Sequence, residues 1–312
     1  MTTANALYLR TPLRRLATVL YQRGRLLLAM LLGPPLLWLC IIYLGSLLAL
    51  LWQGFYSFDD YSMSVLPKLT LANYANIFAH GNFDIVLRTL TMALAVTLAS
   101  AVIAFPIAYY MSRYATPRTK AFFYIGVMLP MWASYIVKAY SWTVILAKGG
   151  IVFWVFGQLH LTWFLDAVLG LPYVGGSTLS TSNLGRFLVF TYLWLPFMVL
   201  PIQAALERVP PNLVQASQDL GARAGQTFRH VILPLAFPGV VAGSIFTFSL
   251  TLGDYIIPNL IGPPGAFIGN FVYIQQGSVG NIPMAAAFTV VPIVLIAIYL
   301  AIAKRMGAFN AL

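Results

Sequence analysis

Charged residues are scarce in this sequence. They make up 8% of 312 residues, whereas a soluble domain carries about 25%. Acids are the scarcest, because only seven Asp and Glu accompany 18 Lys and Arg, and 60% of the chain is hydrophobic. This composition excludes an ordinary soluble globular domain. It predicts an all-α membrane protein with several spans.

Cysteine and histidine are also rare. Cys40 is the single cysteine and lies in an apolar run, so no internal disulfide is expected and its role is structural. The three histidines, His80, His160 and His230, are spread over different loops without the spacing of metal ligands. We therefore expect no catalytic residue, no metal site and no cofactor.

The sequence has no phosphate-binding loop of the pattern Gly-x-x-x-x-Gly-Lys-Ser/Thr. The chain is thus not expected to hold ATP by that device, or to be an enzyme. Its net charge of +11 does not indicate nucleic acid binding, because the basic residues are scattered between apolar runs and form no basic face.

Six apolar runs are long enough to cross roughly 30 Å of hydrocarbon, which takes about 20 helical residues. They are predicted at residues 27–52, 85–111, 122–147, 186–205, 235–257 and 283–303. Most Lys and Arg precede the first run or lie near 113–120, 208–229 and 304–305. Because Lys and Arg favour cytoplasmic loops, both termini and the loop 207–239 are predicted to be cytoplasmic.

The loop 207–239 is the longest polar interruption on that side, and it predicts two short helices with a hinge. Pro211 suits a first helical turn, and Gly221 suits a left-handed helix stop. A second helix from about 225 to 233 is expected to end at Pro234. One small, mostly apolar face of the first helix is formed by Leu213, Ala216, Ser217 and Leu220. The alternative is an ordinary amphipathic connector.

This loop resembles the EAA loop of ABC-importer permeases. The match consists of Gln215-Ala216-Ser217, then Gly221, then Ile232-Leu233-Pro234; Gln215 replaces the family's Glu and Ser217 its second Ala. The resemblance implies a type I importer permease whose coupling helix seats in a groove of a separate ATP-binding subunit. The coupling residues that it implies are Gln215, Ala216, Ser217, Asp219, Leu220, Gly221, Ala222 and Arg223.

The resemblance also gives a domain division. It comprises a basic cytoplasmic arm (1–26), a first transmembrane helix (27–52), a periplasmic loop (53–84) and a core permease domain (85–305) that includes the coupling loop (207–239). The arm is a candidate amphipathic helix on anionic headgroups. The outer loops 53–84 and 148–185 are rich in aromatic residues, which suit the membrane interface, and in this family such loops face a soluble substrate-binding protein.

Ionisable residues within spans are candidate sites because burying charge in a bilayer is costly. Arg88 and Arg186 lie near outer ends and are expected to snorkel. Lys138 is deeper, where snorkelling and lining a wet cavity are equally good interpretations. Asp254 follows Gly253 and precedes Tyr255, in a weakened helix that suits an organic cation. The alternative is an acid capped and solvated at the outer interface.

A narrower resemblance covers the same region. Residues 252–262, followed by Ile268-Gly269-Asn270 and Ile282-Pro283, are similar to the spermidine/putrescine importer permeases. Pro263 and Asn281-Ile282 depart from that pattern, so the solute stays open, and relatives also carry opines, iron or amino-acid-like solutes. The residues expected along the solute path are Asp254, Tyr255, Trp194 and Tyr192, of which the last two flank the Pro196 kink.

The sequence therefore predicts a multi-pass permease of the bacterial inner membrane, most plausibly for polyamines. Its expected partners are a dimer of ATP-binding subunits, a second membrane permease, a periplasmic substrate-binding protein and the lipid bilayer, with no nucleic acid. An ion-coupled secondary transporter is the rival, but it predicts more buried acids than Asp254 alone and an inverted repeat. A membrane-embedded enzyme predicts clustered His, Asp or Glu near one interface.

Overall fold

The computed structural model describes residue 21 and residues 24–305. Most of the predicted basic arm (1–26) therefore lies outside the described residues. The chain divides into two compact units, 1–53 and 54–312, which are described separately below.

The first unit contains one long apolar helix. It is built from α3 (Gly24–Trp38), a π-helical segment η1 (Leu39–Leu44) and α4 (Gly45–Gln53). The apolar part, Leu27–Gln53, is long enough to cross a membrane, and none of its most apolar window is buried within the structure. The first predicted span is thus confirmed as a membrane-length helix. Cys40 is exposed on it and carries a free thiol.

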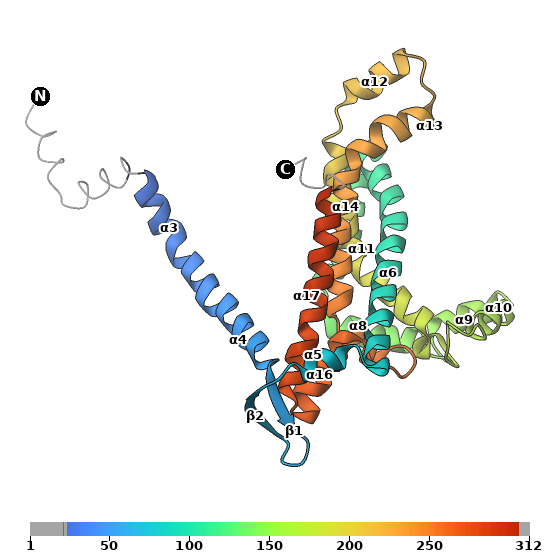
Figure 1. The fold of residues 1–312 in the computed structure, drawn as a ribbon. Coiled ribbons are helices and arrows are strands. Elements are labelled where there is room, and N and C mark those ends of the chain that lie inside the picture. Colours follow the sequence, from blue (N-terminus) through green and yellow to red (C-terminus); the bar gives the residue numbers. More distant parts are fainter. Residues whose placement is uncertain (1–20, 22–23, 306–312) are drawn as a thin grey trace, which may run out of the picture. The chain divides into compact units, whose positions relative to one another are not determined.

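The second unit is organised around four long helices that run side by side (Figure 1). These are α6 (His80–Arg113), α11 (Asn183–Glu207), α14 (Leu233–Gly253) and α17 (Ile282–Arg305). Small residues fill much of the space between them, including the fully buried Ala93, Ala104 and Ala108 of α6. Small side chains let helix backbones approach closely, which is how helices associate in lipid.

The tightest helix pair is α11 with α14. Gly239 of α14 lies against the backbone of α11, where an added Cβ would be 2.6 Å from the carbonyl oxygen of Pro201. Gly243, one turn later, lies against Met198, whose sulfur would be 2.7 Å from such a Cβ. These two glycines fix the distance between the helices, because any larger residue there requires α11 and α14 to separate.

The third predicted span, 122–147, is wrong as a single helix. The structure has α7 (Pro117–Trp132) and α8 (Tyr135–Ile145) in its place, bent by 98° from each other. The break lies at Ala133 and Ser134, which both have extended backbone. Hydropathy alone did not reveal it, because both halves are apolar. Among the described residues, five helices are of spanning length, or six if this bent pair is one span.

The ammonium group of Lys138 explains how the break is tolerated. Its Nζ donates a hydrogen bond of 2.7 Å to the carbonyl oxygen of Pro130, which would otherwise accept from the amide four residues on in a continuous helix. Lys138 thus neither snorkels nor simply lines a wet cavity. It satisfies a backbone acceptor that the bend leaves free.

Short elements gather at the end of the bundle where α8 lies, which we call the α8 end (Figure 1). Strands β1 (Tyr56–Asp59) and β2 (Ser64–Leu69) pair as an antiparallel hairpin, an addition to the expected helical class. Asp59 closes its turn by accepting hydrogen bonds from Ser62 Oγ (2.8 Å) and the amide of Tyr61 (3.1 Å). Both bonds lower the pKa of Asp59, and the bond from Ser62 has the larger effect. The helical pieces are α5 (Ala72–Ile77), α9 (Ile151–Gln158), α10 (Thr162–Leu169) and η2 (Leu179–Thr181).

A folded-back segment joins α14 to α17 at the same end. It contains α15 (Ile256–Leu260), α16 (Ile268–Ile274) and a π-helical turn η4 (Gln275–Val279). The fifth predicted span therefore ends at Gly253 rather than at Ile257, because Asp254 adopts extended backbone. The segment is fixed to α6 by a 3.0 Å hydrogen bond from the amide of Ile268 to Thr89 Oγ1.

Candidate functional site

The predicted coupling loop stands at the opposite end of the bundle, which we call the α12 end (Figure 1). Its first helix is α12 (Pro211–Asp219), with Pro211 in the first turn. Gly221 follows with φ of +83°, a conformation that glycine adopts without the penalty of a side chain. The predicted helix, its proline start and its left-handed glycine stop are all confirmed.

The two faces of α12 differ from the prediction. Ser217 is half-buried, and its Oγ lies 3.0 Å from Oγ1 of Thr227. Val214, which was not predicted, is the apolar residue that packs against the bundle. Leu213, Ala216 and Leu220 point away instead; Leu220 is 89% exposed. The predicted small face is therefore split between an inner contact and an open apolar surface.

Polar residues surround that open surface. Gln215, Gln218 and Asp219 are exposed on α12, Gly221 and Arg223 are exposed in the connection, and Ala222 is half-buried. The amide of Arg223 donates to Oε1 of Gln226 at 2.8 Å, which begins the next helix, α13 (Ala224–Thr227). An apolar centre with a polar rim is the usual build of a protein-binding surface.

The expected end of the second loop helix at Pro234 is wrong. Helix α13 continues through a π-helical segment, η3 (Phe228–Ile232), directly into α14. Together they form one helix, Ala224–Gly253, of 30 residues. Pro234 falls in the first turn of α14, where a wider π turn precedes it, so its ring and missing N–H do not break the helix.

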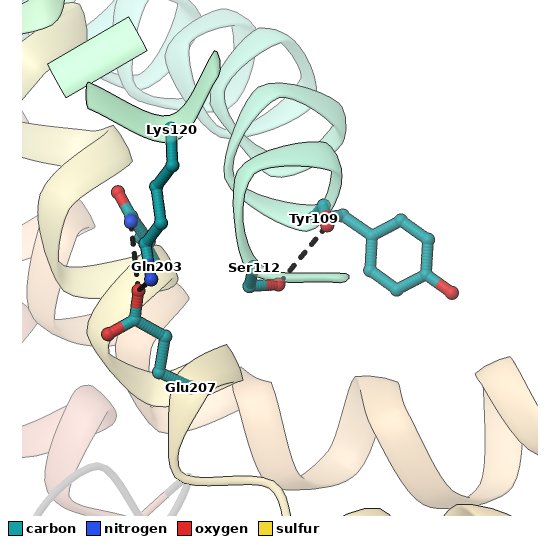
Figure 2. Close-up of polar contacts among 5 residues, drawn as sticks. All are labelled: Tyr109, Ser112, Lys120, Gln203 and Glu207. Carbon is teal, nitrogen blue, oxygen red and sulfur yellow. Dashed lines mark hydrogen bonds and ion pairs between the residues drawn. The ribbon is translucent and has the colours of Figure 1, made fainter. Parts of the chain in front are cut away.

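A polar cluster supports the base of the loop (Figure 2). Lys120 of α7 forms an ion pair of 2.7 Å with Glu207, the last residue of α11. The buried Gln203, one turn earlier, donates to Glu207 Oε1 at 3.0 Å. In the same view, Ser112 donates to the carbonyl oxygen of Tyr109 on α6. The end of α11 is thus tied to α7 immediately before the chain enters α12. No local sequence pattern indicates this pair, because Lys120 and Glu207 lie 87 positions apart.

A cavity of about 370 Å³ opens between the end of α14 nearest α8 and the middle of α11; we call it the outer cavity. Three of the four residues predicted for the solute path line it: Asp254, Tyr255 and Trp194. Tyr192 does not line it; this ring packs against Trp142, with centroids 5.0 Å apart. Positions 192 and 194 of α11 are two residues apart, which rotates one relative to the other by about 200° around the helix axis, so the two aromatic rings point to different sides.

Asp254 is held by groups from two elements. Its Oδ1 accepts hydrogen bonds from the amides of Ile256 (2.8 Å) and Ile257 (3.0 Å) at the start of α15. Its Oδ2 accepts a hydrogen bond from the hydroxyl of Tyr135 on α8. The acid therefore caps the start of α15 and also lines a cavity; its role in a solute path stays a prediction.

Three aromatic rings, those of Tyr135, Trp194 and Tyr255, form part of the cavity wall. Tyr135 and Trp194 stack with ring centroids 5.9 Å apart and planes at 13°. Tyr255 stacks on Tyr273 of α16, with centroids 4.9 Å apart, and separates the outer cavity from a neighbouring one of about 310 Å³. Tyr135 was missed by the sequence analysis, although Pro130 shortly before it could have indicated a break in the predicted span 122–147.

The expectation that Arg186 snorkels is wrong. Its side chain is 1% exposed and donates to the carbonyl oxygens of Ile261 (2.8 Å) and Pro263 (3.1 Å) and to Asn183 Oδ1 (3.1 Å). Its guanidinium also lies 4.4 Å from the ring centroid of Phe267. Arg186 therefore clamps the segment between α15 and α16 to α11. Arg88 is exposed as expected, beside Gly265 of that segment.

No metal-binding arrangement occurs among residue 21 and residues 24–305, where no three His, Cys, Asp or Glu side chains come together. What the described residues bring together is an acid among aromatic rings at the α8 end, and an open apolar helix face at the α12 end. The first can hold an organic cation, and the second can bind another protein.

The chain is similar to several known proteins. Residues 100–308 match the family model described as binding-protein-dependent transport system inner membrane component. The inner membrane ABC transporter permease protein YdcU of Escherichia coli K12 is 68% identical over 292 residues, covering 94% of this chain and 93% of that one. The spermidine/putrescine transport system permease protein PotB of Salmonella typhimurium is 28% identical, covering 86% and 89%. A bacterial ABC transporter that imports the polysaccharide alginate has a similar fold, with TM-score 0.68 at 18% identity, covering 93% and 99%.

Proposed function

Because this chain belongs to the family of binding-protein-dependent transport system inner membrane components, we propose that it imports a polyamine, driven by ATP hydrolysis in a separate pair of subunits. The chain itself is a permease component of an ABC importer. The proposal covers the solute, the separate ATP-binding subunits, a second permease and the orientation of the chain in the membrane.

The open face of α12 is the observation that supports a separate ATP-binding subunit. Leu220 is 89% exposed and Leu213 is 44% exposed at the α12 end. Exposed apolar side chains are unfavourable in water unless another protein covers them. The sequence carries no phosphate loop of its own. We therefore place the ATP-binding subunit on Leu213, Ala216 and Leu220, with Gln215 and Asp219 at the rim.

The same assignment orients the chain. Lys and Arg concentrate toward the α12 end, including Arg113, Arg118, Arg208, Arg223 and Arg229. Cytoplasmic loops are rich in these residues. The α12 end and both termini are therefore cytoplasmic in this proposal, and the α8 end faces the periplasm, where a substrate-binding protein delivers solute to the elements α5, α9 and α10.

One observation favours a polyamine: Asp254 lies among the rings of Tyr135, Trp194 and Tyr255 in a single cavity. A carboxylate with aromatic rings stabilises an ammonium group through charge and cation–π attraction. The similarity to PotB at 28% identity agrees with this solute class. The name of YdcU states no solute, so opine, iron and amino-acid-like solutes are the alternatives to test.

The experiment uses the complete importer purified with its native partners and reconstituted in liposomes. Uptake of radiolabelled putrescine and spermidine is measured with and without ATP. We expect ATP-dependent uptake that falls at least about tenfold in Asp254→Asn, because a carboxylate–ammonium contact is worth about 1.5–3 kcal/mol. Asp60→Asn, an exposed acid in the turn between β1 and β2, is the matched control and should transport normally.

Each outcome separates the alternatives. Uptake driven by an ion gradient without ATP would establish a secondary transporter and overturn the proposal. Unchanged polyamine uptake in Asp254→Asn would remove Asp254 from the solute path. Uptake of an opine or an amino acid in preference to polyamines would keep the importer and reject the solute.

A further inference from the structure

A second cavity of about 370 Å³ lies at the α12 end of the same two helices, α11 and α14; we call it the inner cavity. Pro201 and Ala205 of α11 and Arg208, which follows α11, line one side, and Leu235, Gly239 and Ala242 of α14 line the other. Its wall is largely apolar, and Arg208 is at its cytoplasmic mouth in the proposed orientation. The outer cavity, with Trp194 and Leu250, opens between the same helices nearer the α8 end.

The two cavities lie on one continuous face of each helix. On α11, positions 194, 197, 201, 205 and 208 recur every three or four residues, which places them on one side of an α-helix. On α14, positions 250, 246, 242, 239 and 235 do the same. Each series enters the outer cavity at one end and the inner cavity at the other. The same face of each helix therefore runs from one cavity to the other, and we call the part of these two faces between the cavities the connecting strip.

Two phenylalanines occupy the middle of the connecting strip. Phe197 and Phe246 line neither cavity, and along each helix they lie between the residues that do. Their ring centroids are 6.5 Å apart, so a ring of α11 lies beside a ring of α14. Phe197 also packs edge-on against Trp194, at 5.9 Å. The described aromatic rings thus continue from the wall of the outer cavity to the middle of the connecting strip.

We propose that Phe197 and Phe246 form an aromatic gate that closes this chain's half of the solute path between the outer and inner cavities. The proposal rests on the import function above. Two apolar rings leave no polar partner for a hydrated cation, and apolar constrictions close pathways by excluding water. A solute held at Asp254 reaches the inner cavity only when the rings part.

The surroundings of the two rings indicate which one moves. Phe197 is half-buried against Trp194 and lies next to the buried Pro196. Phe246 is 53% exposed and can change rotamer without opening a hole in the core. On the α12 side of the rings, Gly239 and Gly243 keep α11 and α14 in close contact. Phe246 is therefore the movable half of the gate, and Phe197 is the fixed half.

The test measures access from one cavity to the other in the complete importer, with neither solute nor ATP. Cys40→Ser first removes the single native cysteine. Ala242→Cys then reports on the inner cavity and Ser249→Cys on the outer one, because these residues line the two cavities. A membrane-impermeant cationic thiol reagent is added to right-side-out vesicles, and the labelling rate at each reporter is measured.

We expect fast labelling at Ser249→Cys and slow labelling at Ala242→Cys. Adding Phe246→Ala should speed labelling at Ala242→Cys on the order of tenfold, since the constriction is gone, and leave Ser249→Cys unchanged. Phe246→Leu, which keeps an apolar side chain of similar reach, should restore slow labelling. Phe122→Ala, which truncates a ring that is 73% exposed on α7, is the matched control.

Equal labelling of Ala242→Cys with and without Phe246 would overturn the gate. The result is independent of the solute, because no solute is present. Labelling of Ser249→Cys only in inside-out vesicles would instead contradict the proposed orientation, and then the gate is tested in those vesicles with the same reporters. Failure of the gate and failure of the proposed function therefore give different results.

Discussion

The hydroxyl of Tyr135 donates a hydrogen bond to Oδ2 of Asp254 and thereby joins two breaks in the helical structure. Tyr135 begins α8 immediately after the 98° bend, and Asp254 follows the end of α14. Because Oδ1 is occupied by two backbone amides, this hydroxyl is the side-chain group that orients the rest of the carboxylate. The relationship suggests a direct test of how Asp254 is positioned.

Tyr135→Phe should weaken solute uptake by raising KM more than it lowers kcat. The ring and its stacking on Trp194 are kept, and only a hydrogen bond to a charged group is lost, which is worth about 1.5–3 kcal/mol. Initial uptake rates in liposomes at varied solute concentration measure the effect. Tyr140→Phe, which alters an exposed tyrosine of the same helix, should leave KM unchanged. An unaltered KM in Tyr135→Phe would show that this hydroxyl does not position the acid for solute.

Leu220→Asp should separate the permease from the proposed ATP-binding subunit without unfolding the permease. The side chain is 89% exposed, so a charge there costs little in the free chain but is unfavourable in an apolar contact. We expect the ATPase subunit to be lost from the purified complex, and ATP-dependent uptake to be lost with it. Leu171→Asp, at another exposed leucine, is the control. Retention of the ATPase subunit in Leu220→Asp would place the contact elsewhere.

Gly221→Ala should loosen the coupling loop through backbone strain alone. An added Cβ would meet nothing within 4 Å, yet φ is +83°, a conformation that costs a non-glycine residue about 1–2 kcal/mol. Trypsin cleavage after Arg223 should therefore accelerate. Gly225→Ala has the same free space without a positive φ, and it should not increase cleavage. Equal cleavage in the two variants would mean that the left-handed turn is not needed for order in the loop.

Arg186→Lys should destabilise the segment between α15 and α16, although the charge is kept. Arg186 donates to carbonyl oxygens at Ile261 and Pro263 and to Asn183 at the same time, and an ammonium group cannot reproduce that fork. We expect a loss on the order of 2–4 kcal/mol, measured as a lower thermal midpoint of the purified complex. Arg88→Lys, at the neighbouring exposed arginine, should shift the midpoint little. A wild-type midpoint in Arg186→Lys would refute the clamp.

Features that depend on neighbouring residues could be predicted from the sequence. The proline start of α12 and the left-handed Gly221 lie within eleven residues of each other, and both follow from local backbone preferences. Asp254 and Tyr255 could be selected because they sit together beside a weakened helix. Their membership of one cavity with Trp194 agrees with that selection.

Features that depend on distant packing could not be predicted. Tyr135 meets Asp254 over 119 residues of sequence, and Arg186 meets the carbonyl of Pro263 over 77, so no local pattern relates them. At Pro234 a local pattern was present, but it predicted the wrong structure. The local rule ends a helix there, but a π-helical turn before the proline accommodates its ring, so the helix continues. Tyr192 and Trp194 both flank Pro196 in sequence, yet helical rotation separates their side chains.

The continuous helix Ala224–Gly253 has a mechanical consequence. Its 30 residues lead without interruption from the coupling loop, past the contact with α11 at Gly239 and Gly243, to Gly253 in the wall of the outer cavity. A displacement of Ala224 is therefore carried to the residue beside Asp254 by one helix, with no loop between them.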